Sequence, residues 1–489
     1  MNRFKVFIFV LMPIFLFGQL KIQFQDYFED KTMRIDYYHF GNAQSEEVTV
    51  DQIYMQDIWA GNLKNLIDPF NNGAYFVKVY DVASNVLIYS KGFNSIFGEY
   101  QTTDPAINGE KRTYHESALI PCPKASVIFV LEKRNKMNIL KPVFMKKIDP
   151  DDVSVIREEP DLSIQIYEAL KTGDVHKKVD LVWLAEGYTR DEFELFCKDV
   201  DRYVDIFFGF EPYNKFKKDF NITGVFQPSA GKGIDQPRKG VYKKTAVDAS
   251  FNALGVSRYV LTENNRAIQD IASRVPYDAI VILVKEERYG GGGIYNTYAI
   301  TTVDNELSDN VFIHEFGHSF AGLGDEYYSS SVAYNDFYPK GFEPAEPNIT
   351  ALLNPEKLKW SELVDPDLSI PTKWGKEDRD SIIVKRGALW VEQRERIKEL
   401  ENEGVSEEKV TETKSKYKAK IDSIQKQLDQ VQARFKDIEG KVGAFEGAGY
   451  NAKGLYRPEM ECLMFSNRGK KFCSVCQKAI EEMIRYFCN

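Results

Sequence analysis

The chain has 489 residues, of which 43% are hydrophobic and 28% are charged, and its formal net charge is −9. This composition is typical of a globular protein of two or three domains. The acidic balance and the lack of a recognisable RNA- or DNA-binding motif exclude nucleic acid as an expected partner.

The N-terminus has the pattern of an export signal. A basic start, "MNRFK", precedes an apolar run of 13 residues, "VFIFVLMPIFLFG". The run is too short for a comfortable membrane span, and Pro13 interrupts it. We expect residues 1–18 to be a signal peptide cleaved near Gly18, with an uncleaved anchor as the alternative. The mature protein is then exported, to the periplasm, the cell surface or the medium, without stable membrane insertion.

Residues 19–150 predict a β-sandwich domain. Alternating or aromatic-rich runs such as "NVLIYSKGF" and "ASVIFVLEKR" lie between turn signals such as "DPFNNG". His39 and His115 fall in this region without a nearby cluster of ligand-type residues, so we interpret both as structural. The polar, proline-containing stretch at 151–175 is predicted to be a linker.

From residue 176 the pattern changes to alternating strands and helices. The apolar "KKVDLVWLAEGYT" is followed by a helix-periodic segment that opens at Thr189, and "FNITGVFQPS" and "YDAIVILVK" are further apolar strands. This alternation favours an α/β domain with a mostly parallel sheet, placed at 176–489. Glycines 290–293 then precede another strand; they fit a flexible hairpin loop, or the rim of an edge strand that pairs with an extended peptide.

Residues 386–440 predict a helical hairpin inserted into this domain. Apolar side chains recur there at heptad spacing, at Tyr417, Ile421, Ile424, Leu428, Val431, Phe435 and Ile438. Most other residues of the stretch are charged or are glutamine, as in a coiled coil. We interpret the charged surface as solvated, with binding of a partner as the alternative.

The stretch "VFIHEFGHSFAGLGDEYY" at 311–328 carries the candidate chemistry. On a helix, His314 and His318 lie one turn apart on one face, so both imidazoles can bind one metal ion. Glu315 is rotated from them by about 100° and lies beside the metal, where it can take a proton from a bound water. The plain alternative is an amphipathic helix that buries two histidines.

A catalytic zinc site needs a third protein ligand. The remaining histidines lie in the predicted β domain and its linker, so a carboxylate is expected. Gly322 lets the chain leave the helix and turn back, because glycine tolerates a left-handed backbone. Asp325 and Glu326 follow, and one of them is the predicted ligand; Glu343 or Glu346 is an alternative further along.

This helix resembles the active-site helix of the bacterial immunoglobulin A peptidase family of zinc metallopeptidases, a family similar to the metzincins. Further matches are "LAEGYT" at 184–189, "GAFEGAGY" at 443–450 and "YRPEMECLMFSNRGKKFCSVC" at 456–476. The resemblance implies an α+β multidomain protein: a β-sandwich followed by a metzincin-like α/β peptidase domain with the inserted hairpin.

The resemblance also assigns roles to single residues. It implies one zinc ion bound by His314 and His318, with Glu315 as general base and Met464 as the methionine-turn residue. The Gly-x-x-Asp arrangement selects Asp325 as third ligand, with Glu326 then supporting the site. Glycine and ligand stand one residue later than in the metzincins.

The expected function is therefore that of an exported zinc metalloendopeptidase acting on a protein or peptide, whose natural substrate the resemblance does not establish. Tyr327 or Tyr328 is a candidate donor to the oxyanion. The alternative is an exported glycan- or protein-binding surface protein with a vestigial metal site. A general base at Glu315 would serve no purpose in such a protein.

The six cysteines are Cys122, Cys197, Cys462, Cys473, Cys476 and Cys488. Export permits disulfides, and we favour a staple among the C-terminal four. A redox pair at Cys473 and Cys476, or a second metal site, is the alternative. The metal site is not favoured because the sequence has no further cysteine pair with zinc-knuckle spacing.

Overall fold

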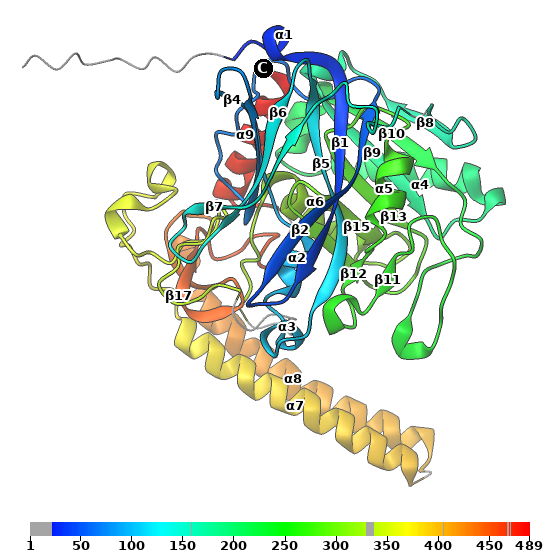
Figure 1. Cartoon of the computed structure of the whole chain (residues 1–489). Helices are drawn as coiled ribbons and strands as arrows, with labels where there is room; N and C mark the ends of the chain where they lie inside the picture. The colour runs from blue at the N-terminus through cyan, green and yellow to red at the C-terminus, as the bar shows by residue number, and fades with distance from the viewer. Residues whose placement is uncertain (1–21, 158, 329–336, 404, 467–468, 470) are drawn as a thin grey trace, which may run out of the picture.

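The computed structural model describes residues 22–157, 159–328, 337–403, 405–466, 469 and 471–489. The predicted signal peptide lies outside these residues. Figure 1 shows a rounded body from which two long helices project side by side. Within the described part of the chain, no helix is both long enough and apolar enough to cross a bilayer.

The N-terminal domain consists of two antiparallel sheets. One has the order β2-β1-β5, from β1 (Phe28–Gly41), β2 (Glu46–Gln56) and β5 (Arg112–Pro123). The other has the order β4-β3-β6-β7, from β3 (Tyr75–Asp81), β4 (Leu87–Phe93), β6 (Val127–Arg134) and β7 (Leu140–Ile148). Ile35 and Ile120 of the first sheet share a buried core with Val79 and Phe129 of the second. The short helices are α1 (Phe24–Tyr27), α2 (Ile96–Tyr100) and α3 (Asp104–Ile107).

His39, in β1, is fully buried between two carboxylates. Its Nδ1 lies 2.9 Å from Glu116 Oε2, and its Nε2 lies 2.8 Å from Glu46 Oε1. Burial alone would lower the pKa of this imidazole, but the two carboxylates raise it to about 9. The protonated histidine therefore forms ion pairs that join β1 to both neighbouring strands of its sheet.

The second domain is built on a six-stranded sheet with the order β14-β15-β13-β9-β10-β8. The four inner strands are parallel: β9 (Val179–Glu186), β10 (Phe220–Phe226), β13 (Ala279–Val284) and β15 (Tyr298–Thr302). The edge strands β8 (Gln165–Leu170) and β14 (Gly291–Ile294) are antiparallel to their neighbours. The predicted mostly parallel sheet is present, but β8 lies inside the stretch predicted as linker. Its six residues, "QIYEAL", are exposed or half-buried, as in a strand at the edge of a sheet.

Helices cover both faces of this sheet (Figure 1). α4 (Phe193–Phe207), α6 (Ser308–Ala321) and α9 (Ser474–Cys488) share one buried cluster with the sheet, and α5 (Asn265–Ala272) belongs to the cluster on the other face. In α6, Phe312, Phe316 and Phe320 are buried at helical spacing. Phe316 packs against Phe207 of α4, and Phe320 against Phe487 of α9. These contacts fix the position of α6.

Smaller elements complete the domain. They are the pairs β11 (Ser250–Phe251) with β12 (Val260–Leu261) and β16 (Phe445–Ala448) with β17 (Asn451–Arg457), and 3₁₀ turns at Val175–Lys177, Arg190–Glu192, Tyr213–Asp219, Pro237–Lys239, Ala253–Gly255, Pro355–Lys357, Ser361–Leu363 and Lys436–Ile438.

The two domains are joined by hydrogen bonds beside β14. The Asn94 amide donates to the Tyr295 carbonyl at 2.9 Å, and Thr297 Oγ1 donates to the Asn94 carbonyl at 2.9 Å. Asn296 Nδ2 donates to the Gly92 carbonyl at 2.7 Å. The end of β4 is therefore held against the turn between β14 and β15.

The projecting helices are α7 (Lys376–Asn402) and α8 (Glu407–Ala433). All seven predicted seam residues of the stretch are buried or half-buried. The first helix begins at Lys376 and not at 386. The sequence did not indicate the earlier start because the opening turns are charged and show little apolar periodicity. No observation in the described residues supports the partner-binding alternative.

We expect the outer part of this hairpin to be dispensable for folding. Arg386 Nη1 donates to Gln425 Oε1 at 2.8 Å, and Tyr417 donates to Glu392 further out. Replacing residues 391–420 with a short Gly/Ser turn keeps the inner pair and the base, so the chain should remain soluble and fold cooperatively. Circular dichroism should show less helix and a thermal transition near that of the intact chain. An insoluble or unfolded product would show that the hairpin supports the body.

Candidate active site

Helix α6 carries His314, Glu315 and His318 and ends as the sequence predicts. Gly322 caps it with φ +64°, a left-handed backbone that glycine adopts without strain. His314 is only 5% exposed, and His318 and Glu315 are partly exposed toward a pocket. The turn at Gly322 brings the following segment back against the two histidines.

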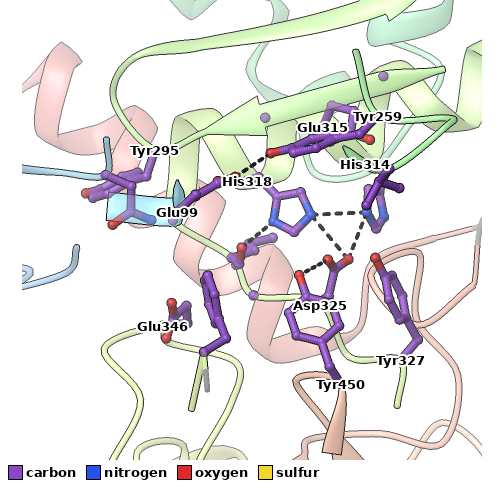
Figure 2. Close-up of a pocket in the computed structure, with 18 of the residues that line it drawn as sticks. Glu99, Tyr259, Tyr295, His314, Glu315, His318, Asp325, Tyr327, Glu346 and Tyr450 are labelled. Atoms are coloured by element: carbon purple, nitrogen blue, oxygen red, sulfur yellow. Dashed lines mark hydrogen bonds and ion pairs between the residues drawn. The ribbon is translucent and has the colours of Figure 1, made fainter. Parts of the chain in front are cut away.

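Three donor atoms converge at this turn (Figure 2). The Nε2 atoms of His314 and His318 lie 3.1 Å apart. Asp325 Oδ1 lies 3.0 Å from the first and 3.3 Å from the second. In a tetrahedral site with zinc bonds of about 2.0–2.1 Å, neighbouring donor atoms are about 3.3 Å apart. The spacing therefore suits one small divalent ion.

The hydrogen bonds of the two rings hold their Nε2 atoms toward Asp325. His314 Nδ1 donates to the Leu463 carbonyl at 3.0 Å, and His318 Nδ1 donates to the Leu323 carbonyl at 2.6 Å. A carbonyl only accepts, so each ring carries its proton on Nδ1. Asp325 Oδ1 is buried and has no donor besides these rings. The two Nε2 atoms thus face one buried carboxylate oxygen, a cluster that needs a positive charge, supplied by a bound cation or by a proton on the imidazoles.

Asp325 is held from its other side by Tyr450. The Tyr450 hydroxyl donates to Asp325 Oδ2 at 2.6 Å, and the Gly449 amide donates to the Asp325 carbonyl at 2.9 Å. Gly449 and Tyr450 form the two-residue turn between β16 and β17, with φ +54° and +64°. Both angles are positive, as in the hairpin turns that match strand twist. A tyrosine in this backbone conformation is uncommon, and here it positions a candidate ligand.

Glu315 lies beside the donor atoms. Its carboxylate is within 4.8 Å of both imidazole nitrogens, yet among the described residues it makes no ion pair with them, whereas Asp325 pairs with both. Burial raises the pKa of Glu315, and the two imidazoles partly offset this. A carboxylate with a raised pKa at this place is suited to accept a proton from water.

The charges of the other groups reinforce one another. Burial opposes ionisation of Asp325, but His318 and His314 hold its pKa well below the usual value. Burial likewise lowers the pKa of His318, and Asp325 more than compensates and raises it to about 9. In the protein groups alone, Asp325 is therefore the carboxylate whose negative charge is favoured.

The alternative ligands are not brought to the histidines. Glu326 points away and accepts a hydrogen bond from Asn348 Nδ2 at 3.0 Å. Glu343 pairs with Lys359 at 3.2 Å. Glu346 lines the pocket but does not contact either imidazole (Figure 2).

Met464 lies in a turn against the middle of α6. It is fully buried, and its Sδ lies 3.3 Å from the position that a Cβ on Gly317 would take. The residue before it, Leu463, orients His314, and the Met464 carbonyl accepts the Glu326 amide at 2.8 Å. The turn thus contacts both segments that bear candidate ligands.

The two candidate oxyanion donors have different surroundings. Tyr327 lines the pocket, and burial together with Asp325 raises its pKa well above the usual value, so it keeps its proton. Tyr328 does not line this pocket. Its hydroxyl donates to Asp380 Oδ1 at 2.6 Å and accepts from Arg379 Nη1, at the base of the hairpin. The structure therefore places Tyr327 at the pocket and Tyr328 at the base of the hairpin.

Glycines of β14 form the wall beside α6. A Cβ on Gly293 would lie 2.3 Å from the Glu315 carbonyl oxygen, and one on Gly291 would lie 2.6 Å from Val311 Cγ1. The interpretation as a flexible loop is wrong for the glycines at 291–293: they lie in β14, and they let the helix pack close to it. Pairing of this strand with an extended substrate stays a prediction.

The N-terminal domain supplies the opposite wall. Asn94 and Glu99 line the pocket, and Tyr259 donates its hydroxyl proton to Glu99 Oε2 at 2.7 Å. Sequence reasoning missed both this wall and Tyr450. For Tyr450 a signal was available in the matching stretch "GAFEGAGY"; for Glu99 there was none, because it comes from a different domain.

Two family models match the chain. The one described as IgA Peptidase M64 covers residues 167–484, and the one described as Peptidase M64 N-terminus covers residues 23–145. No curated protein matches the chain.

Proposed function

This chain belongs to the IgA peptidase M64 family, and from that premise we propose that it is an exported, zinc-dependent endopeptidase. Membership makes it a peptidase with protein or peptide substrates. The proposal adds the metal, the roles of the site residues and the export. Export is supported by the N-terminal sequence pattern. The immunoglobulin in the family description is not carried over as the substrate of this chain.

One observation carries the metal proposal: the Nε2 atoms of two histidines converge on a buried carboxylate oxygen that has no other donor. Two imidazoles and one carboxylate form a donor set used by catalytic zinc, which keeps a fourth position open. We assign His314, His318 and Asp325 as the ligands. The pocket lies at the open side of this group.

When bound there, zinc would lower the pKa of a water molecule and polarise the scissile carbonyl. The protein groups then have separate tasks. Glu315 takes the proton from the water and delivers it to the leaving amine. Tyr327 keeps its proton and donates a hydrogen bond to the developing oxyanion. Tyr450 holds Asp325 in place, and Leu463 and Leu323 fix the ring orientations.

The binding-protein alternative accounts for less of the site. It gives no reason for Glu315 to lie in the pocket with a raised pKa, nor for a tyrosine held in a left-handed backbone above Asp325. A vestigial site would not need either feature.

Removing the metal should abolish activity. Purified protein should cleave casein, lose cleavage after treatment with a zinc chelator, and regain it when zinc is added after the chelator has been removed. Circular dichroism before and after treatment checks that the body stays folded. Cleavage that persists after the histidine-bound metal has been removed would contradict the proposal.

A further inference from the structure

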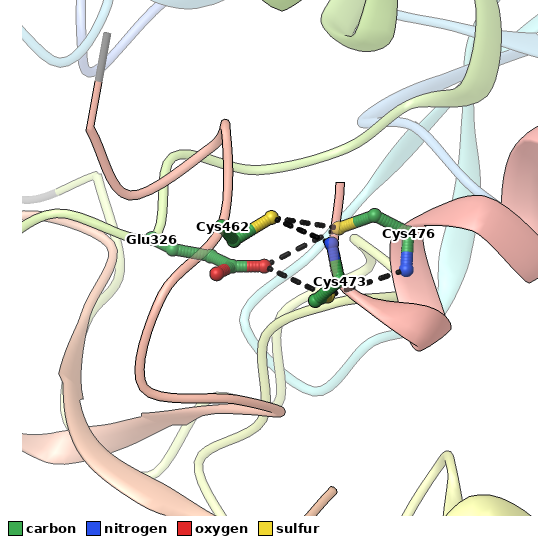
Figure 3. A group of neighbouring side chains, drawn as sticks. All are labelled: Glu326, Cys462, Cys473 and Cys476. Carbon is green, nitrogen blue, oxygen red and sulfur yellow. Dashed lines mark hydrogen bonds between the residues drawn. The ribbon is translucent and has the colours of Figure 1, made fainter. Parts of the chain in front are cut away.

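Four side chains that the proposed catalysis does not use meet at a second point in this domain (Figure 3). Glu326 comes from the segment after α6, Cys462 from just before the Met464 turn, and Cys473 and Cys476 from the start of α9. Each has one ligand-type atom within 4.8 Å of the other three. All four are buried, with exposed fractions of 0% to 1% for the cysteines and 0% for Glu326.

The distances match a tetrahedral site better than a disulfide. Cys462 Sγ lies 3.8 Å from Cys476 Sγ, and Glu326 Oε1 lies 3.3 Å from Cys476 Sγ and 3.7 Å from Cys473 Sγ. Four ligands around zinc, with bonds of about 2.3 Å to sulfur, place sulfur atoms about 3.8 Å apart. A disulfide needs about 2.05 Å. All six cysteines of the chain are free thiols, so the C-terminal staple favoured from the sequence is not formed.

Backbone amides point at two of the three sulfur atoms. The amides of Cys473 and Met464 donate to Cys462 Sγ at 3.2 and 3.4 Å, and the Cys476 amide donates to Cys473 Sγ at 3.5 Å. Cys473 is the N-cap of α9, where the helix dipole stabilises negative charge.

Glu326 provides an independent observation. Its Oε2 is buried and has no hydrogen-bond partner, although its Oε1 accepts from Asn348. Arg457 acts on this carboxylate only at longer range, because its guanidinium donates to the carbonyls of Gly447 and Met460. A buried carboxylate that lies beside three thiols and leaves one oxygen without a partner is costly unless a cation binds there.

We propose that Glu326, Cys462, Cys473 and Cys476 bind a second zinc ion with a structural role. Three thiolates select a soft or borderline cation, and zinc takes four such ligands in a closed tetrahedral site. None of the four side chains lines the catalytic pocket, so substrate has no access to this ion.

A zinc ion at the second site would stabilise the two segments that position the catalytic ligands. Glu326 directly follows Asp325, and Cys462 directly precedes Leu463, whose carbonyl orients His314. The Glu326 amide also donates to the Met464 carbonyl at 2.8 Å. A zinc ion held by Glu326 and Cys462 therefore ties the third-ligand segment to the Met464 turn and anchors both to α9.

Metal analysis of the full chain, purified without chelator or reductant, tests this site. We expect two zinc ions per chain, and zinc-edge X-ray absorption should show sulfur in the coordination shell. The His314→Ala/His318→Ala variant should keep one zinc ion, now with mainly sulfur ligands. That readout does not depend on activity, so failure of the catalytic proposal and failure of this one are distinguishable.

Cysteine variants provide the second arm. Cys473→Ser/Cys476→Ser should lose the sulfur-bound zinc and unfold at lower temperature, whereas Cys488→Ser, on the same helix but outside the cluster, should keep both ions. Denatured, chelator-treated wild type should titrate six thiols. Four thiols with a Cys462–Cys476 disulfide, or zinc without sulfur ligands in the wild type, would overturn the proposal. Both measurements are made on the wild type, so they test the proposal even if the cysteine variant does not fold.

Discussion

Glu315→Gln should bind zinc like the wild type and cleave substrate about 10²–10⁴-fold more slowly. The amide keeps the size of the side chain but cannot take a proton from water. Its neighbours His314 and His318 keep their contacts with Asp325, so the metal stays. Zinc content and kcat for a fluorogenic peptide are the measurements.

A matched control is Glu306→Gln, an exposed glutamate just before α6 that should behave like wild type. Normal turnover in Glu315→Gln would remove Glu315 from the mechanism. Loss of zinc in this variant would instead make Glu315 a ligand, which its position within 4.8 Å of both imidazole nitrogens makes worth testing.

Asp325→Ala should lose the catalytic zinc ion and with it all measurable cleavage. The substitution removes the only carboxylate oxygen that contacts both Nε2 atoms among the described residues, and two histidines alone are too few ligands to hold zinc tightly. Zinc titration against a competing chelator gives the affinity.

Tyr450→Phe provides a graded comparison. It removes one hydrogen bond to Asp325 Oδ2 but no ligand, so zinc affinity should fall by about 10- to 100-fold. Full zinc occupancy in Asp325→Ala would mean that another residue completes the site and would reverse the assignment.

The spacing of residues predicted the part of the site that lies on one helix. A four-residue interval places His314 and His318 on one face whatever the rest of the fold does, and the glycine after the helix predicts a turn that returns a carboxylate to them. The β-rich first domain and the largely parallel sheet of the second were likewise predictable, because strand and helix periodicities are local.

The sequence could not choose between Asp325 and Glu326 from local chemistry alone. Both are acidic and adjacent, and their directions depend on the backbone after Gly322. The structure sends them to different clusters, one with the histidines and one with the cysteines. Tyr450 and Leu463 lie more than a hundred residues further along the chain, and only tertiary packing brings them to the site.

The cysteines show a related limit. Their even number and the expected export favour disulfides, and a zinc knuckle would need a second cysteine pair, which the sequence lacks. The fourth member of the cluster is a glutamate from a distant segment, so no cysteine spacing could reveal it. The hairpin boundary at Lys376 was missed for a different reason: a charged first turn has no apolar period to detect.

The junction beside β14 has a consequence for how this enzyme can be dissected. Gly92 and Asn94 are bonded to the turn that ends β14, and Asn94 and Glu99 line the pocket that holds Glu315. A truncated protein that begins at the peptidase domain would retain every proposed zinc ligand and the general base. It would nevertheless lack the wall of the pocket that Asn94 and Glu99 form. Because both domains line the pocket, we expect selectivity to depend on both, so that exchanging the N-terminal domain with that of a relative should change the peptides that are cleaved.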